Sequence, residues 1–160
     1  MIRRELERFE ITYAFFGNEL GARVSDPSLY VDGKVSYNKL AGSDLFKRGL
    51  HEIQELASNA QVAMMCAERE PLACHRSILV SRYLQANRYQ VAHILGTGDL
   101  ETHENTMNRL IRILGLHEAD MFKSQDEILA EAYTIQGDRI AYDPTKQPHQ
   151  LSAFGGAKAR

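Results

Sequence analysis

This sequence of 160 residues lacks the features that direct a protein into a membrane, out of the cell or onto nucleic acid. Its longest apolar run, residues 62–67, is far shorter than the roughly 20 residues that a membrane-spanning helix needs. No apolar signal-peptide segment follows the first five residues. Lysine and arginine number 19 against 21 acidic residues, which excludes a general positive field for collecting nucleic acid. We expect a soluble, cytoplasmic protein with no membrane partner.

Cysteine is scarce and tryptophan is absent. The two cysteines, Cys66 and Cys74, lie in one short window, which excludes the disulfide framework of a small secreted domain. Hydrophobic residues make up 44% and charged residues 25%, so the composition is that of an ordinary globular domain and not of a disordered chain. A chain of this length buries enough surface to fold without a disulfide or a metal.

Strand-like and helix-like patterns alternate along the chain and predict its fold class. Runs rich in β-branched, aromatic or continuous apolar residues predict strands at 11–16, 62–65 and 91–95. Apolar residues at helical spacing predict helices between and around them, near residues 2–9, 43–57, 74–86, 107–114 and 124–132. Because such alternation favours parallel pairing through right-handed crossovers, the prediction is a single α/β domain with a mainly parallel sheet.

Local signals add a hairpin and set the boundaries of this domain. Asp32-Gly33 stands between two strand-like runs, which predicts an inserted β-hairpin with a type I′ turn. Ser43 is a predicted N-cap, and Ser124 with Glu127 forms a predicted capping box. Two prolines and a Gly-Gly pair follow Tyr142. We therefore predict a domain over residues 1–142 and a disordered tail over 143–160.

A candidate site is expected where the predicted strands end. Ligands of parallel sheets bind beyond the carboxyl ends of the strands, and the loops 17–23, 66–76 and 96–103 leave those ends. These loops carry many polar side chains: Glu19, Arg23, Cys66, Glu68, Arg69, Cys74, His75, Arg76, Asp99 and His103.

The two thiols are candidate nucleophiles. Cys74 lies near a predicted helix start, where the helix dipole and the adjacent His75 and Arg76 favour a thiolate. Glu68 is a candidate general base and His75 a candidate proton carrier. The alternative is that both cysteines are small core residues. The spacing fits neither a C-x-x-C dithiol nor a phosphatase loop.

The same loops suggest anion binding and, less directly, metal binding. Arg23, Arg69 and Arg76 are candidate donors to a phosphate or carboxylate, with Glu19 and His103 in support. The alternative for Arg76 is an ion pair with Glu19 or Glu68 that holds the loops together. A metal is a further alternative, because the loop residues with His93 or His103 offer zinc-type ligands. C-x7-C is not a usual zinc spacing and His93 fits a core histidine, so no metal ligand is assigned.

Residues 65–76 carry a resemblance to a known family. The segment from Cys66 to Arg76 resembles the C-A-E-x-x-P-x-x-C-H-R signature of the domain of unknown function family 488. Further blocks agree in order: residues 17–23 with its G-x-E-L-G-G-R loop, 46–50 with its F-x-x-G-L helix, 93–95 with its V-x-H-I strand and 133–142 with its closing helix. The resemblance covers nearly all of residues 3–142. It implies a three-layer, Rossmann-like fold and brings no settled reaction.

One departure from the family concerns the start of the chain. The family usually begins with a glycine-containing strand and an Asp-Val-Arg strand or loop, and this sequence has neither before residue 11. We expect the helix near residue 2 to lie on a sheet whose edge or apolar surface stays uncovered, which favours a homodimer. A different start codon is the alternative.

Two classes of function stay open, with a third behind them. The first is an enzyme that acts on an anionic small molecule, with the catalytic and anion-binding residues named above. The second is a non-catalytic module that binds a nucleotide, a nucleic acid or a protein, although neither a basic surplus nor a tryptophan supports nucleic acid. The third is a metal-binding protein. The convergence of two thiols, an imidazole and several guanidiniums favours the enzyme, and no cofactor is predicted.

Overall fold

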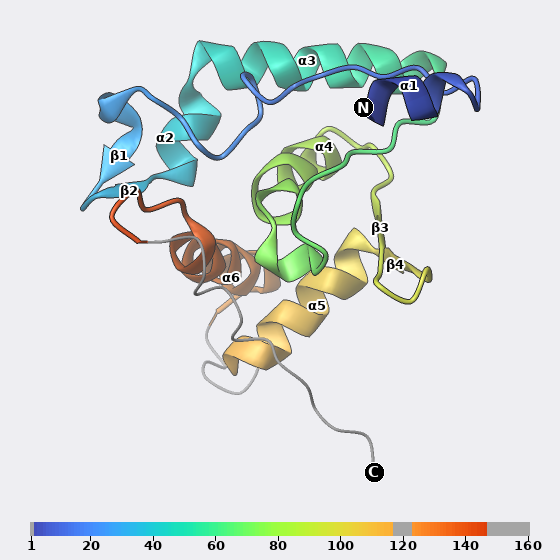
Figure 1. Cartoon of the computed structure of the whole chain (residues 1–160). Coiled ribbons are helices and arrows are strands. Elements are labelled where there is room, and N and C mark those ends of the chain that lie inside the picture. Colours follow the sequence, from blue (N-terminus) through green and yellow to red (C-terminus); the bar gives the residue numbers. More distant parts are fainter. Residues whose placement is uncertain (1, 117–122, 147–160) are drawn as a thin grey trace.

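The computed structural model describes residues 2–116 and 123–146, and in these ranges helices predominate (Figure 1). The α-helices are α1 (Ile2–Glu7), α2 (Tyr37–Gly42), α3 (Asp44–Asn59), α4 (Arg82–Ala86), α5 (His103–Leu114) and α6 (Gln125–Ile140). The strands are β1 (Tyr30–Val31), β2 (Lys34–Val35), β3 (Ala92–Ile94) and β4 (Leu100–Thr102). Two 3-10 turns, η1 (Pro27–Leu29) and η2 (Pro71–Ala73), and a π-helical turn, η3 (Arg76–Ser81), complete the described elements.

The predicted mainly parallel, Rossmann-like sheet is wrong. The described strands form two separate antiparallel pairs, β1 with β2 and β3 with β4. Of the three predicted strands, only 91–95 contains one, and its partner is the neighbouring β4. Residues 11–16 and 62–65 carry no strand structure, because no segment of the described chain pairs with their backbone. Strand propensity alone does not supply such a partner.

The segments that fail to pair leave apolar side chains in solvent. Ile11, Phe15, Val62 and Met65 are exposed, and α1 buries none of its residues. The expected exposed apolar surface is therefore present, while the expectation that the first helix lies on a sheet is wrong. The homodimer stays a prediction. In the part of the chain that is described, no helix has the length and apolar character to cross a membrane.

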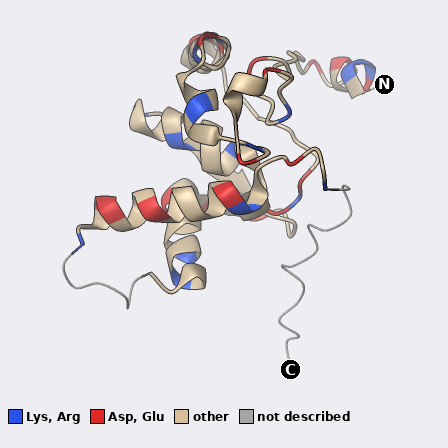
Figure 2. Cartoon of the chain, turned by 90° about the vertical axis from the view of Figure 1, so that its left-hand side faces the viewer, with Lys and Arg blue, Asp and Glu red and all other residues tan. Residues whose placement is uncertain are grey.

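Local signals agree with the helix ends at three places, whereas α2 has no predicted counterpart and α5 begins at His103 instead of near residue 107. Ser43 caps α3 by accepting a hydrogen bond from the amide of Phe46. Ser124 and Glu127 form the predicted capping box of α6. Gly115 ends α5 in the left-handed region, at φ 70°. Figure 2 shows both basic and acidic residues on the helices.

The core consists of two clusters that meet at η3. One cluster includes Leu40 and Phe46 with Leu79, and the other includes Leu110 and Ala132 with residues of η2 and η3. Figure 1 shows η3 and α4 between α3 on one side and α5 and α6 on the other. Residues 77–81 are all buried. The segment that directly follows His75 is therefore held between the two core clusters.

The predicted hairpin is confirmed, and it yields a test. Asp32 and Gly33 have φ angles of 47° and 79°, the two positive values that a type I′ turn requires. Gly33→Ala should lower the free energy of unfolding by about 1 kcal/mol, because a side chain there is strained although nothing lies within 4 Å of its Cβ. Gly42→Ala is the matched control. A Cβ at position 42 also meets no atom within 4 Å, and Gly42 ends α2 without a positive φ. This substitution should therefore not destabilise the protein in urea unfolding.

Candidate functional site

The candidate site lies on the loop between α3 and η3. Cys66 follows the unpaired segment 60–65, and Cys74 ends the short turn η2. Pro71 begins that turn and Glu70 caps it, because the Glu70 carboxylate accepts a hydrogen bond from the amide of Leu72 at 3.3 Å. This turn brings the chain back on itself, so that residues eight positions apart in the sequence face each other.

Arg76 holds the loop in this shape. Its Nη1 donates to the carbonyl of Met64 at 2.9 Å, and its Nη2 donates to the carbonyl of Glu68 at 3.0 Å. Its Nε donates to the sulfur of Cys74 at 3.1 Å, and its backbone amide lies 3.4 Å from the same sulfur. The loop is thus held by Arg76, but through main-chain carbonyls and a sulfur instead of a carboxylate of Glu19 or Glu68.

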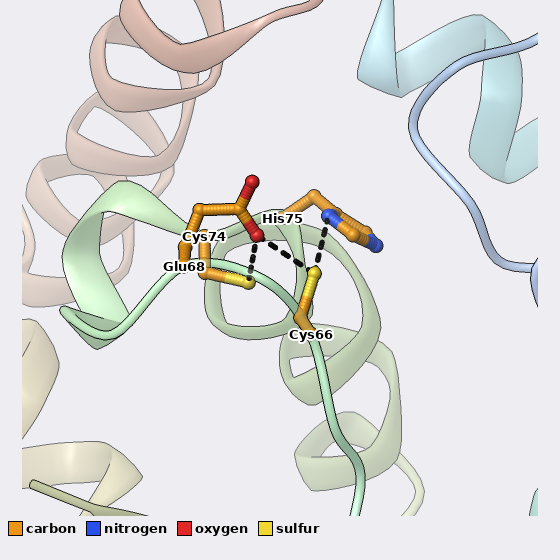
Figure 3. Close-up of side chains that lie close together, drawn as sticks. All are labelled: Cys66, Glu68, Cys74 and His75. Carbon is orange, nitrogen blue, oxygen red and sulfur yellow. Dashed lines mark hydrogen bonds between the residues drawn. The ribbon is translucent and has the colours of Figure 1, made fainter. Parts of the chain in front are cut away.

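Four potential ligand side chains meet on this loop (Figure 3). The thiol of Cys66 donates to Oε2 of Glu68 at 2.7 Å, and its sulfur lies 3.8 Å from Nδ1 of His75. The thiol of Cys74 lies 3.5 Å from the same Glu68 oxygen. The four donor atoms all lie within 4.8 Å of one another. Cys74 is fully buried, whereas Cys66 is at the surface. We call this set the Cys-Glu-His cluster.

The proximity of these groups changes their acidity. Burial, the hydrogen bond to Glu68 and the neighbouring Cys74 raise the pKa of the Cys66 thiol to about 12. Burial opposes the charge of Glu68, but hydrogen bonds from the Cys66 thiol, its own backbone and Cys74 outweigh it and lower the pKa of that carboxyl. Burial also lowers the pKa of His75, against the attraction of Glu68. The resting cluster is therefore a protonated Cys66 thiol, a carboxylate and a neutral imidazole.

The remaining predicted site residues lie outside this cluster. Arg69 donates to the carbonyl of Gly96 at 2.6 Å, and Arg23 stacks over the ring of Tyr142. Glu19 packs against Gly49 and holds one buried carboxylate oxygen without a partner among the described residues. The predicted convergence of three arginines on one anion is not seen. Its basis was the edge of a parallel sheet that the fold does not contain.

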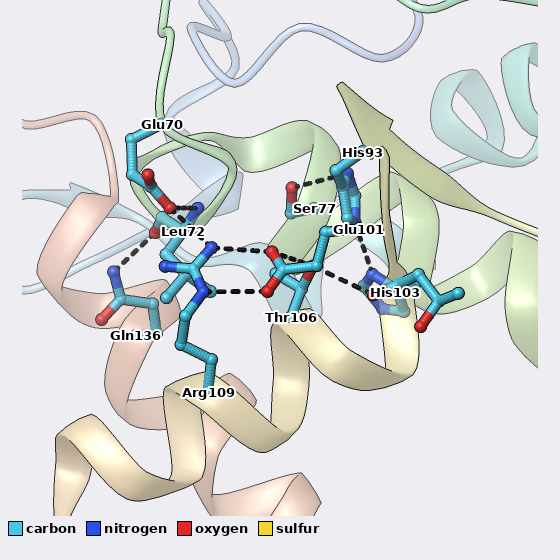
Figure 4. A network of polar contacts seen from close by, with 10 residues as sticks. Glu70, Leu72, Ser77, His93, Glu101, His103, Thr106, Arg109 and Gln136 are labelled. Atoms are coloured by element: carbon cyan, nitrogen blue, oxygen red, sulfur yellow. Dashed lines mark hydrogen bonds and ion pairs between the residues drawn. The ribbon is translucent and has the colours of Figure 1, made fainter. Parts of the chain in front are cut away.

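His103 belongs to a second, buried polar network (Figure 4). Its Nδ1 lies 2.8 Å from Nε2 of His93, and its Nε2 lies 2.7 Å from the hydroxyl of Tyr133. The hydroxyl of Ser77 extends this network, because it lies 3.4 Å from Nδ1 of His93. The expectation that His93 is a core histidine is confirmed. His103 shares a helix face with Met107 and Leu110, a spacing that would have identified it as a core residue.

Arg109 is a polar residue that the sequence did not single out. It bridges two carboxylates, with Glu70 at 3.0 Å and Glu101 at 2.9 Å (Figure 4). Because Glu70 also caps η2, this bridge connects the loop of the cluster to α5. Glu70 and Arg109 are 39 positions apart, and no local pattern in the sequence indicates that they form an ion pair.

Comparison with known proteins identifies one family. The model of a family described as "Domain of unknown function DUF488" matches residues 2–83, which is just over half of the chain and includes the whole Cys-Glu-His cluster. Neither a curated protein nor a solved structure matches the chain. The match does not extend to the predicted likeness at residues 93–95 and 133–142. The chain therefore belongs to the DUF488 family, which carries no assigned function.

Proposed function

We propose that the protein binds a thiophilic divalent metal ion, of which zinc fits best, through the Cys-Glu-His cluster. The observation that carries this proposal is the meeting of two sulfurs, one imidazole nitrogen and one carboxylate oxygen within 4.8 Å. Sulfur and imidazole ligands select zinc over magnesium and calcium, which prefer oxygen.

The distances suit a tetrahedral site. Zinc lies about 2.3 Å from sulfur and about 2.0–2.2 Å from nitrogen or oxygen, so its ligand atoms stand about 3.3–3.8 Å apart. In the cluster, Oε2 of Glu68 lies 2.7 Å from the Cys66 sulfur and 3.5 Å from the Cys74 sulfur. The Cys66 sulfur lies 3.8 Å from Nδ1 of His75. Shifts of about 1 Å in the surface side chains Cys66 and Glu68 would complete the geometry. Arg76 meanwhile keeps the buried Cys74 in place.

The acidity of the cluster favours a metal over a free nucleophile. A nucleophilic cysteine needs a lowered pKa, whereas the pKa of Cys66 is raised to about 12. A bound cation would replace the thiol protons and neutralise the crowded sulfurs and carboxylate. The low pKa of His75 leaves its ring nitrogen free to coordinate at neutral pH.

A thiol enzyme is the second candidate, since the Glu68 carboxylate lies 2.7 Å from the Cys66 sulfur and can accept its proton. It predicts that the metal-free protein alkylates at Cys66 faster than an ordinary thiol near neutral pH. An anion pocket has less support, because each nitrogen of the Arg76 guanidinium already donates a hydrogen bond to an atom of the protein.

Zinc titration against a chromophoric chelator tests the metal site. The reduced protein should bind one equivalent, and His75→Asn should weaken binding about 100-fold, which corresponds to one ligand's share of a typical site. His51→Asn is the control, because His51 is exposed on α3 and its described partner is Glu55 on the same helix. The affinity should fall as the pH is lowered, since both thiols must give up protons. Equal affinity for the His75 and His51 variants would refute the proposal.

A further inference from the structure

The two cysteines of the chain stand in the same cluster, and this juxtaposition carries a consequence beyond metal binding. We propose that Cys66 and Cys74 are an oxidation site, at which a peroxide joins them in a reversible intramolecular disulfide and thereby expels the bound metal ion. The disulfide stands on the geometry of the two thiols alone. The expulsion of the metal rests on the proposed function.

The two sulfurs are near enough to join after a small movement of one loop. Their separation is at most 4.8 Å, against about 2.05 Å in a disulfide. Cys74 is fixed, because it is fully buried between η2 and η3 and its sulfur accepts hydrogen bonds from Arg76. Cys66 is the movable partner. It lies at the surface outside every helix and strand, and its side chain contacts Glu68 and His75.

The surroundings assign a separate part to each thiol. Cys66 is the accessible sulfur, so the peroxide reaches it first. Its raised pKa makes this thiol a slow nucleophile, so the Glu68 carboxylate at 2.7 Å must accept the proton as the sulfur attacks. Cys74 is shielded from peroxide, and its sulfur is held by a hydrogen bond from Nε of Arg76 at 3.1 Å. It is therefore placed to attack the oxidised Cys66.

The reaction balances with peroxide as the only oxidant. The Cys66 sulfur attacks one peroxide oxygen, the O–O bond breaks, and a sulfenic acid and one water form. The Cys74 sulfur then attacks the sulfenic sulfur, the S–S bond forms and the S–O bond breaks. The hydroxide that leaves takes up the Cys74 proton and departs as a second water. Both electrons taken by the peroxide come from the two sulfurs.

Oxidation removes half of the metal ligands at once. Glu68 and His75 remain, and a carboxylate with one imidazole does not hold zinc against a chelator. A thiol reductant restores both sulfurs and the site with them. The metal in turn should protect the thiols, because a thiolate bound to zinc is less available for attack.

The test treats reduced full-length protein with hydrogen peroxide, with and without one equivalent of zinc, and measures free thiols, intact mass and chelator-trapped zinc. We expect the loss of both thiols, a monomer whose intact mass has lost both thiol hydrogens, and release of the bound zinc. Dithiothreitol should reverse all three changes. Sulfinic acid on Cys66, or disulfide-linked dimers in place of the monomer, would overturn the disulfide. Retention of zinc by the disulfide form would overturn the expulsion.

The metal-free arm separates this inference from the proposed function. If the reduced protein binds no zinc, the metal site and its expulsion fail, while the disulfide is still decided by thiol count and mass. Glu68→Gln keeps both thiols and should slow peroxide consumption by metal-free protein several-fold. Glu52→Gln, on the exposed face of α3, should not. Equal rates for the two variants would remove Glu68 from the mechanism.

Discussion

Replacing Arg76 with alanine should lower the free energy of unfolding by about 3 kcal/mol and abolish the Cys-Glu-His cluster. The guanidinium donates to the carbonyls of Met64 and Glu68 and to the sulfur of Cys74. Hydrogen bonds from a charged donor contribute about 1.5–3 kcal/mol each, and the partial exposure of the loop reduces their sum. Without these bonds residues 64–68 lose their anchor to η3, while Arg69 and Glu70 still hold the next part of the loop through Gly96 and Arg109.

Two further variants separate this role from a loss of charge. Arg76→Lys keeps the charge but has one nitrogen in place of a planar fork, so it cannot reach both carbonyls and should recover less than half of the lost stability. Arg48→Ala, on the exposed face of α3, should change stability by less than about 0.5 kcal/mol. Urea unfolding measures all three. If Arg76→Lys were as stable as the unmodified protein, the clamp would be refuted.

The features that sequence predicts well here are those determined within a few residues. Ser43 and Ser124 cap helices through amides three positions away, and Asp32-Gly33 forms its turn through its own φ preferences. The four members of the Cys-Glu-His cluster are each candidate site residues by sequence, whereas their meeting is shown by the structure. Residues 66–75 lie on one continuous loop, so the same short segment that carries the chemistry also brings it together.

The parallel sheet could not be predicted correctly because it depends on distant partners. The run at 62–65 has the composition of a buried strand, but a strand forms only where another backbone offers hydrogen bonds. No described segment does so, and Val62 and Met65 remain exposed. The expected gathering of side chains depends on this sheet as well. Without a shared sheet edge, Arg23, Glu19 and His103 lie apart from the Cys-Glu-His cluster.

Acidification should destabilise the protein through its buried histidines. His103 is almost fully buried, and burial together with the charge of His93 lowers its pKa from 6.5 to about 4. Burial also lowers the pKa of His93, with a further contribution from Arg76. In the folded protein one ring nitrogen of the pair must donate and the other accept across 2.8 Å, so both rings cannot carry a second proton.

The direction of the effect follows from which state binds more protons. Below pH 6.5 the unfolded chain protonates His103, while the folded protein does not until about pH 4. The stabilisation is therefore complete above pH 6.5 and is lost progressively as the pH falls to about 4, by about 3 kcal/mol in total for this residue. Urea unfolding at several pH values across this range measures the loss.

Substitution identifies the responsible group. His103→Gln should be less stable at neutral pH, because it disturbs the bonds to His93 and Tyr133, but its stability should depend less on pH between 6.5 and 4. His51→Gln, which removes an exposed histidine of α3, should retain the full dependence. If His103→Gln lost as much stability on acidification as the His51 variant, His103 would not be the group that titrates. The loss would then come from His93 or His75, because burial also lowers the pKa of each of these rings in the folded protein.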